Sequence, residues 1–206
     1  MTHWLDDIRG IGRRRFVALV AASAFIAFGT AASATEDEEP YIDDDGLYHQ
    51  SWFLESFLEL RDDLDEATAE GKRFAIMWEQ KGCPYCIETH LVNFADPDIR
   101  DFVRHNFTVV QLNLYGSRIV TDFDGEELEE RDLARKYGVR FSPTIQFFPD
   151  VSDGIGTKAA RDREIARMPG YLKPPHFLAM FRYVKDRGYQ DGSFRSYLKR
   201  QRDEAS

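Results

Sequence analysis

The sequence predicts an α/β domain with a central mixed sheet of about four strands flanked by helices. Two observations predict this class. Short apolar segments of strand length are separated by segments with helical periodicity, a pattern typical of strands joined by helices. Near the end of the chain, two such segments follow each other without a helix between them, which predicts an antiparallel pair. An extra N-terminal helix and a C-terminal helical extension complete the predicted architecture.

The composition supports one folded domain with attachments. The chain has 206 residues, of which 43% are hydrophobic and 14% aromatic, enough to form a core. Its formal net charge is −9 at pH 7. An acidic chain without a basic stripe is poorly suited to phosphate backbones, so we expect no nucleic-acid partner.

Residues 1–34 are predicted to be a signal peptide. Arginines at 13–15 are followed by an apolar run at 16–28 and by small residues that end in an Ala-x-Ala site. This order is typical of export signals, and the run is short for a membrane span. The motif "RRRFV" also resembles a twin-arginine signal, and an uncleaved anchor is the alternative. We therefore expect a periplasmic protein that begins near Thr35.

The rest of the chain is predicted to contain a linker, a domain and a tail. Residues 35–49 are expected to form an acidic linker, because "TEDEEPYIDDDG" offers little apolar area to bury. We assign no site to this segment. The domain is predicted to span residues 50–190, and a helical tail is predicted at 191–206.

The first half of the domain is predicted to contain a helix, a strand, two helices and a second strand. An apolar stripe from Phe53 to Ala67 predicts the first helix over residues 50–70, which Gly71 would end. The run "RFAIMW" (73–78) is typical of a buried strand. The next elements are a helix from Cys83 to about Asn93, a helix that Asp96 and Pro97 begin, and the strand "FTVVQLNL" (107–114).

The second half is predicted to add a helix, an antiparallel strand pair and two more helices. A polar loop at 115–126 precedes a helix over about 128–137. The paired strands are "TIQFF" (144–148) and "REIARM" (163–168), joined by a turn that contains Gly and Asp. The last elements are a helix that Pro174 and Pro175 begin and a short helix from Ser193 to about Arg202.

Cys83 and Cys86 are the only cysteines in the chain and lie three positions apart in "EQKGCPYC". A structural disulfide over so short a loop would stabilise the fold little. A metal site is an alternative because His90 would add a third ligand, although structural zinc needs four. Covalent haem needs a histidine directly after the second cysteine, where Ile87 stands. We favour the fourth interpretation, redox exchange.

Redox chemistry follows from the predicted position of Cys83 at the start of a helix. Unpaired backbone N–H groups and the helix dipole favour the thiolate there. Pro84 in the first turn costs no hydrogen bond. Cys86, one turn further on, can attack a mixed disulfide and release the partner. Gly82 leaves the approach side open.

A second motif, "KYGVRFSPTIQFF" (136–148), resembles the segment of thioredoxins that carries a cis-proline. The resemblance implies the thioredoxin fold and a cis bond between Ser142 and Pro143. It also implies a substrate groove that Pro143 shapes and in which Ser142 offers its backbone to a peptide. Pro84 and Tyr85 would line the groove. The alternative for Pro143 is an ordinary strand start.

Residues 50–190 resemble the SoxW-type periplasmic thioredoxins in particular. The resemblance rests on "EQKGCPYC", "QLNLYG", "VTDFDGEEL", "LARKYGVRFSPT" and "MPGYL". It implies an exported thiol–disulfide oxidoreductase linked to sulfur oxidation. A membrane thiol transporter would reduce it, and it would keep the cysteine of a sulfur-carrier protein reactive. The Cys83–Cys86 disulfide would be its redox group, with no separate cofactor or metal.

One departure from thioredoxins concerns the proton acceptor of Cys86. Thioredoxins typically carry a buried acid six positions before the first cysteine and a lysine on the next strand, whereas this chain has Met77 and Gln111. Glu79 is the nearest substitute, and we expect it to assist deprotonation of Cys86. The alternative is an exposed loop carboxylate.

We therefore predict a disulfide reductase that attacks with Cys83 and resolves with Cys86. Two alternatives stay open. One is a thioredoxin-fold oxidase or isomerase, and the other is a non-enzymatic metal-binding module that uses Cys83, Cys86 and His90. Acidic residues at 122–127 could bind a cation or a basic partner, although a solvated loop is more common.

Overall fold

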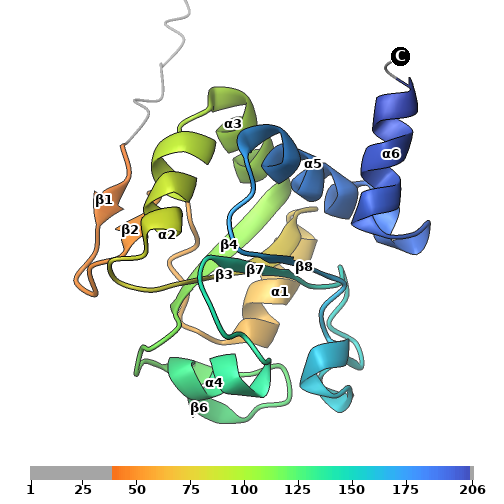
Figure 1. The fold of residues 1–206 in the computed structure, drawn as a ribbon. Coiled ribbons are helices and arrows are strands. Elements are labelled where there is room, and N and C mark those ends of the chain that lie inside the picture. Colours follow the sequence, from red (N-terminus) through yellow and green to blue (C-terminus); the bar gives the residue numbers. More distant parts are fainter. Residues whose placement is uncertain (1–38, 205–206) are drawn as a thin grey trace, which may run out of the picture. The chain divides into compact units, whose positions relative to one another are not determined.

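The computed structural model describes residues 39–204 of the chain (Figure 1). The predicted signal peptide and the start of the predicted linker lie outside the described residues. Within residues 39–204, no helix has the length and apolar character needed to cross a membrane.

A four-stranded mixed sheet forms the centre of the domain, which confirms the predicted architecture (Figure 1). Its strands are β3 (Arg73–Glu79), β4 (Phe107–Asn113), β7 (Thr144–Phe147) and β8 (Ala166–Pro169), in the order β4-β3-β7-β8. β3 and β4 are parallel, whereas β7 is antiparallel to β3 and to β8. Every residue of β3 is buried, because sheet neighbours flank it and helices cover both faces.

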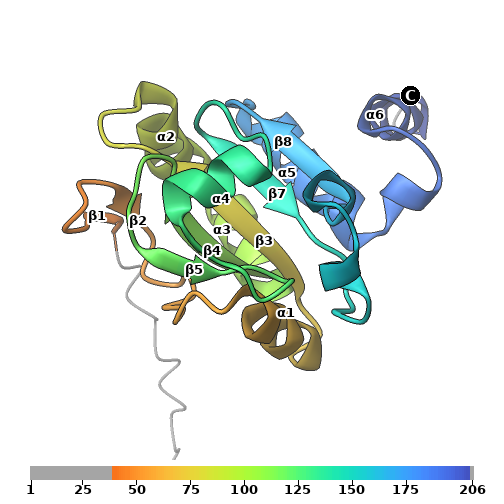
Figure 2. The same ribbon diagram turned by 90° about the horizontal axis from the view of Figure 1, so that it is seen from below.

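Helices cover both faces of this sheet (Figure 1 and Figure 2). The α-helices of the described residues are α1 (Leu60–Ala69), α2 (Pro84–Glu88), α3 (Pro97–Asn106), α4 (Glu130–Lys136), α5 (Pro174–Lys185) and α6 (Phe194–Glu204). α3 and α5 lie over one face, and α1 and α4 lie over the other. A π-helical turn, Thr89–Asn93, continues α2. The predicted N-terminal helix and C-terminal helical extension correspond to α1 and α6.

The side chains of β3 alternate between two halves of the core. Phe74, Ile76 and Trp78 pack in the half that contains α1 and α4. Ala75 and Met77 pack in the half that contains α3 and α5. The same two-residue period places the side chain at position 79 on the face of Met77.

The first helix is shorter than the sequence predicts. α1 begins at Leu60, and Leu58 just before it has a positive φ of 64°. Phe53 packs in the core half with α3 and α5, whereas Leu60 and Leu64 belong to the other half. Phe57 is 96% exposed. The apolar stripe therefore belongs to two segments that pack on opposite faces of the sheet.

Two short antiparallel hairpins appear where the sequence predicts a linker and a loop. β1 (Tyr41–Ile42) pairs with β2 (Tyr48–His49) within the segment expected to be a linker. β5 (Ile119–Thr121) pairs with β6 (Glu127–Glu129) at the expected polar loop. Strands of two or three residues are too short to show a periodic pattern. The first hairpin lies beside α2, so part of the expected linker borders the cysteine motif (Figure 1 and Figure 2).

Asp63 in α1 makes the stability of the domain depend on pH. Burial, the largest influence, and neighbouring acids raise its pKa to about 6, while a hydrogen bond from Ser56 Oγ at 2.6 Å opposes the rise. The folded carboxyl group therefore binds a proton more tightly than the unfolded one. The free-energy cost of burying the ionised carboxylate is therefore absent below about pH 4. It grows as the pH rises through about 6.

Asp63→Asn is expected to raise the free energy of unfolding by about 1–2 kcal/mol above pH 7. The amide carries no charge to desolvate and can still accept the Ser56 hydrogen bond. Urea unfolding at neutral pH and near pH 4 checks this, because the gain should vanish at the lower pH. The exposed neighbour Asp62, changed to Asn, is the control. A destabilised Asp63→Asn variant at neutral pH would contradict the account.

Candidate active site

The two cysteines lie after the C-terminal end of β3, where a loop leads into α2. Cys83 is the N-cap residue of α2, and its Sγ accepts a hydrogen bond from the backbone N–H of Cys86 at 3.1 Å. Pro84 follows as the first helical residue, so the predicted helix start is confirmed. The cysteines form a disulfide with a Cα–Cα distance of 5.2 Å. Once the disulfide is reduced, the N–H groups at this helix start favour a Cys83 thiolate.

The surface beside the disulfide is open and aromatic. Cys83 is 5% exposed and Cys86 is 4% exposed, whereas the adjoining Tyr85 is 58% exposed. The Tyr85 ring stacks on Tyr171 with a centroid distance of 5.8 Å and an interplanar angle of 15°. Gly82 has a φ of 73°, and apart from its two chain neighbours no residue has an atom within 4 Å of the place where a Cβ would be. A partner can therefore approach Cys83 past Gly82 while it contacts Tyr85.

The Ser142–Pro143 peptide bond is cis, as the resemblance implies. Thr144 pairs with Trp78 of β3, so Pro143 lies level with the end of that strand. The carbonyl oxygen of Pro143 accepts a hydrogen bond from Gly170 N–H at 2.8 Å, which ties the segment to the end of β8. The Ser142 backbone forms no hydrogen bond with another residue in 39–204. It is thus free to pair with an extended peptide.

Glu79 is the last residue of β3 and is only 1% exposed, so it is a buried carboxylate. Its Oε2 lies 3.0 Å from Nε2 of His90 and also accepts a hydrogen bond from Nε2 of Gln111. Its Oε1 is buried and has no hydrogen-bond partner within residues 39–204. The alternative of an exposed loop carboxylate is therefore wrong for this residue.

A small cavity connects Glu79 with the cysteines. Its volume is about 20 Å³, and Glu79, Cys83 and Cys86 all line it. That is enough space for about one water molecule. The remaining lining residues come from the cysteine loop, α2 and the first hairpin: Gln80, Gly82, Ile87, Gly46, Leu47 and Tyr48. Glu79 and Cys86 therefore border one small space.

His90 faces Glu79 and is fully buried at 0% exposure. Its Nε2 contacts Glu79, and its Nδ1 lies 3.1 Å from Nε2 of Gln50. Both ring nitrogens are therefore engaged, which argues against the alternative of a metal site with Cys83 and Cys86. No group of three or more His, Cys, Asp or Glu side chains within residues 39–204 could hold a metal ion.

Sequence reasoning did not find the partners of Glu79. The strand period could have placed Glu79 on the face of Met77, and the pairing of Met77 with Gln111 places β4 beside it. Gln50 and the first hairpin carry no such signal. They reach the site only through the tertiary fold.

Three acids of the loop at 122–127 are paired with basic side chains within the protein. Lys136 Nζ lies 2.5 Å from Asp122, 2.8 Å from Asp124 and 2.8 Å from Glu126. Arg163 lies 2.7 Å from Asp122 and 2.6 Å from Asp124. These carboxylates therefore form an internal ion cluster with two basic side chains.

Comparison with solved structures gives distant likenesses. A thioredoxin-fold protein from Helicobacter pylori is 20% identical, and the match covers 69% of this chain and 94% of that one, with a TM-score of 0.49. A thioredoxin from Thermus thermophilus is 24% identical over 61% of this chain and 83% of its own, with a TM-score of 0.45. The oxidised DsbD C-terminal domain from Neisseria meningitidis is 15% identical. The match covers 60% of this chain and 90% of that one, with a TM-score of 0.40. We draw no conclusion from likenesses this distant.

A match to a protein family shows where the chain belongs. No curated protein matches the chain. The family model of the thioredoxin-like domain, however, matches residues 60–185, which are more than half of the chain. The disulfide and the cis-proline both lie inside the matched range. The chain therefore belongs to the family of thioredoxin-like domains.

Proposed function

We propose that this protein is an exported thiol–disulfide oxidoreductase that reduces disulfides or mixed disulfides on periplasmic partner proteins. The observation that carries the proposal is the Cys83–Cys86 disulfide at a helix start, level with a cis-proline. Membership of the thioredoxin-like family supports the reaction class. The sequence features of residues 1–34 support export.

The reaction begins with the reduced protein. The Cys83 thiolate attacks one sulfur of a partner disulfide, forms a mixed disulfide and displaces the other sulfur as a thiolate. Cys86 then transfers its proton to Glu79 and attacks Cys83 Sγ. The second partner sulfur leaves as a thiolate, so the partner gains two electrons and the protein ends with the Cys83–Cys86 disulfide. That oxidised state is the one in the structure.

Substrate binding is assigned to the surface around the disulfide. A peptide that lies extended along Ser142 can form backbone hydrogen bonds there, while Pro143 excludes a closer approach. Pro84 and Tyr85 contact the same peptide from α2. These roles fit any partner with an accessible disulfide, because backbone contacts carry little sequence preference.

The resemblance to SoxW-type proteins supports a narrower role. In that role a membrane thiol transporter returns the disulfide to the dithiol, and a sulfur-carrier protein is one partner. The same dithiol could run in reverse as an oxidase or isomerase, since the direction depends on the reduction potential of the couple.

The reduction potential of the Cys83–Cys86 couple tests the direction. We expect a value near or below about −270 mV, as in thioredoxin, because a reductase must be more reducing than its partner's disulfide. Equilibration in dithiol and glutathione buffers, followed by alkylation and mass measurement, gives the value. The variant Cys86→Ser is the control, because it can form a mixed disulfide with glutathione but not the Cys83–Cys86 disulfide. A value near about −120 mV would contradict the reductase role and make the protein a disulfide donor.

A further inference from the structure

We propose that Gln111 and His90 are positioning residues that hold one carboxylate oxygen of Glu79 and leave the other free for the proton of Cys86. The inference rests on the proposed function, in which Glu79 is the acid–base group. It adds that residues 48–50, in and just after the first hairpin, orient both positioning residues.

The amide of Gln111 has a single orientation because all of its polar positions are used. Its Oε1 can only accept, so the contact at 2.6 Å means that Nδ1 of His49 carries a hydrogen and donates it. Its Nε2 donates one hydrogen to the carbonyl oxygen of Tyr48 at 2.7 Å and the other to Oε2 of Glu79. His49 and Tyr48, both in β2, therefore aim one N–H of Gln111 at the carboxylate.

The hydrogen-bond partners of His90 likewise determine the tautomer and the orientation of its ring. Nε2 of Gln50 can only donate, so Nδ1 of His90 accepts at 3.1 Å. The ring hydrogen then lies on Nε2, which donates it to Oε2 of Glu79 at 3.0 Å. The ring is 0% exposed and packs between Phe53 and Phe94, with centroid distances of 5.9 and 5.7 Å. It has little freedom to turn.

These contacts make the two oxygens of Glu79 unequal. Oε2 receives two directed N–H donors, whereas Oε1 receives none within residues 39–204. Glu79 and Cys86 also line the same small cavity. The oxygen without donors has its lone pairs free for a proton, so the proton of Cys86 goes to Oε1.

The proton step balances within the resolving reaction. Cys86 loses its S–H proton to Glu79 Oε1, directly or through one water in the cavity. Its sulfur forms the bond to Cys83 Sγ as the bond from Cys83 to the partner breaks, and the partner leaves as a thiolate. The proton on Oε1 then passes to solvent or to that thiolate, and the two N–H donors on Oε2 are unchanged throughout.

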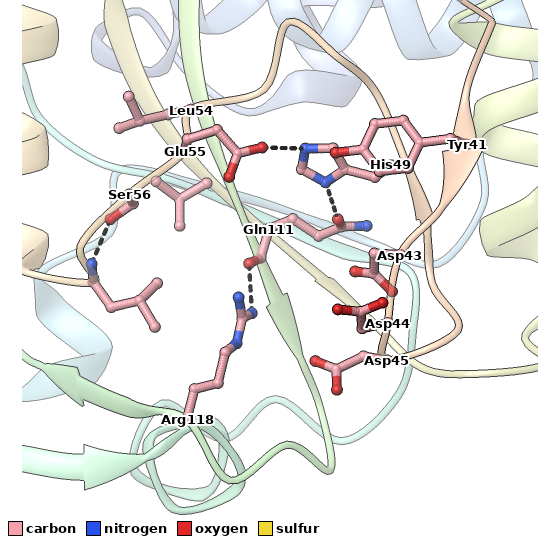
Figure 3. Close-up of a pocket in the computed structure, with 12 residues that line it drawn as sticks. Tyr41, Asp43, Asp44, Asp45, His49, Leu54, Glu55, Ser56, Gln111 and Arg118 are labelled. Carbon is pink, nitrogen blue, oxygen red and sulfur yellow. Dashed lines mark hydrogen bonds and ion pairs between the residues drawn. The ribbon is translucent and has the colours of Figure 1, made fainter.

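A surface pocket borders the outer side of this arrangement (Figure 3). His49 lines the pocket and lies between Gln111 and Glu55, with its Nε2 at 3.4 Å from Oε1 of Glu55. The titratable groups on the inner side of Glu79 are Cys83, Cys86, His90 and Tyr48. Those on the pocket side are Tyr41, His49, Asp43, Asp44, Asp45, Glu55 and Arg118. Among the hydrogen bonds described above, only those of the Gln111 amide connect the side chains of this pocket with Glu79.

Two-phase kinetics separates the cysteines. Reduced full-length protein is mixed with dithiobis(nitrobenzoate), and the first release of thionitrobenzoate reports attack by Cys83. The second release reports attack by Cys86 on the resulting mixed disulfide. We expect Gln111→Met and His90→Leu to slow the second phase about tenfold near pH 6 and to move its pH profile up by about one unit. The first phase should stay unchanged, and His90→Gln, which keeps a donor, should recover most of the rate.

Controls separate a positioning role from general damage. Gln146 is also a buried sheet glutamine, but it bonds to Trp78 and Glu164, so Gln146→Met should leave the profile of the second phase unchanged. Should Gln111→Met not fold, the pair His90→Leu and His90→Gln makes the same test. An unchanged second phase in the folded variants, or an equal shift in Gln146→Met, would overturn the inference. A wild-type protein without the first phase would instead contradict the proposed function.

Discussion

Cys83→Ser is expected to reduce disulfide reductase activity by roughly a thousandfold or more, because a serine hydroxyl is not ionised near neutral pH and cannot replace the thiolate. Cys83 is the residue at the helix start, and its Sγ already accepts the Cys86 N–H hydrogen bond. Reduction of a model protein disulfide, followed by turbidity or by thiol titration, measures the loss. Thermal unfolding of the reduced variant and of the reduced wild-type protein checks that the variant is folded.

Cys86→Ser is the matched control and should behave differently. The attack by Cys83 persists, but the mixed disulfide cannot be resolved from within the chain and therefore accumulates. Mass measurement after mixing with a disulfide substrate should show one adduct per chain, and the same experiment with Cys83→Ser should show none. Turnover in Cys83→Ser, or an adduct on Cys86 in that variant, would contradict the assigned order of attack.

Arg163→Met is expected to lower the free energy of unfolding by about 3 kcal/mol, because it leaves a buried carboxylate with fewer partners. The side chain of Asp122 is 0% exposed and that of Arg163 is 3% exposed. Asp122 also accepts a hydrogen bond from the Tyr137 hydroxyl at 2.7 Å, and burial raises the pKa of that phenol. Urea unfolding at neutral pH measures the change.

The same cluster should weaken in acid. Burial alone would raise the pKa of Asp124, but hydrogen bonds from Lys136 and Arg163 outweigh it and hold the pKa below its usual range. The stabilisation by Asp124 is therefore complete above the unfolded pKa of about 4 and is lost as the pH falls below it.

The control for Arg163→Met is Arg135→Met, which breaks an exposed pair with Asp132 and should lower the free energy of unfolding by less than about 1 kcal/mol. Equal effects of the two arginine variants would contradict the role of burial.

The central sheet and the cysteine motif could be predicted because their signals are local. β3 contains a continuous apolar run between Arg73 and Glu79, and a helix start at Cys83 follows from Pro84 and the preceding loop. The start of α1 could not be predicted correctly. Phe53 and Leu60 fit one helical stripe in the sequence, yet they pack on opposite faces of the sheet. A periodic pattern shows which residues are apolar, but not which core they enter.

The surroundings of Glu79 could be predicted only in part. Its proximity to the cysteines follows from the sequence, but its burial depends on hydrogen bonds from residues far along the chain. Gln50 lies 40 positions before His90, and Gln111 lies 32 positions after Glu79. The segment that supplies Gln50 follows an acidic stretch typical of a linker. Its two-residue strands form because β1 and β2 pair with each other, which no local pattern indicates.

The alternating side chains of β3 limit where an acid can serve a cysteine pair in this fold. Positions 77 and 79 point into the same core half, and position 78 holds Trp78 in the other half. A carboxylate can therefore be relocated along this strand by two residues but not by one. When the carboxylate lies two residues closer to the cysteines, its hydrogen-bond partners also change. A lysine on the adjacent strand is replaced by an amide and an imidazole. Two chains of this family could thus use acids at different positions for one task, and an alignment by position alone would miss the equivalence.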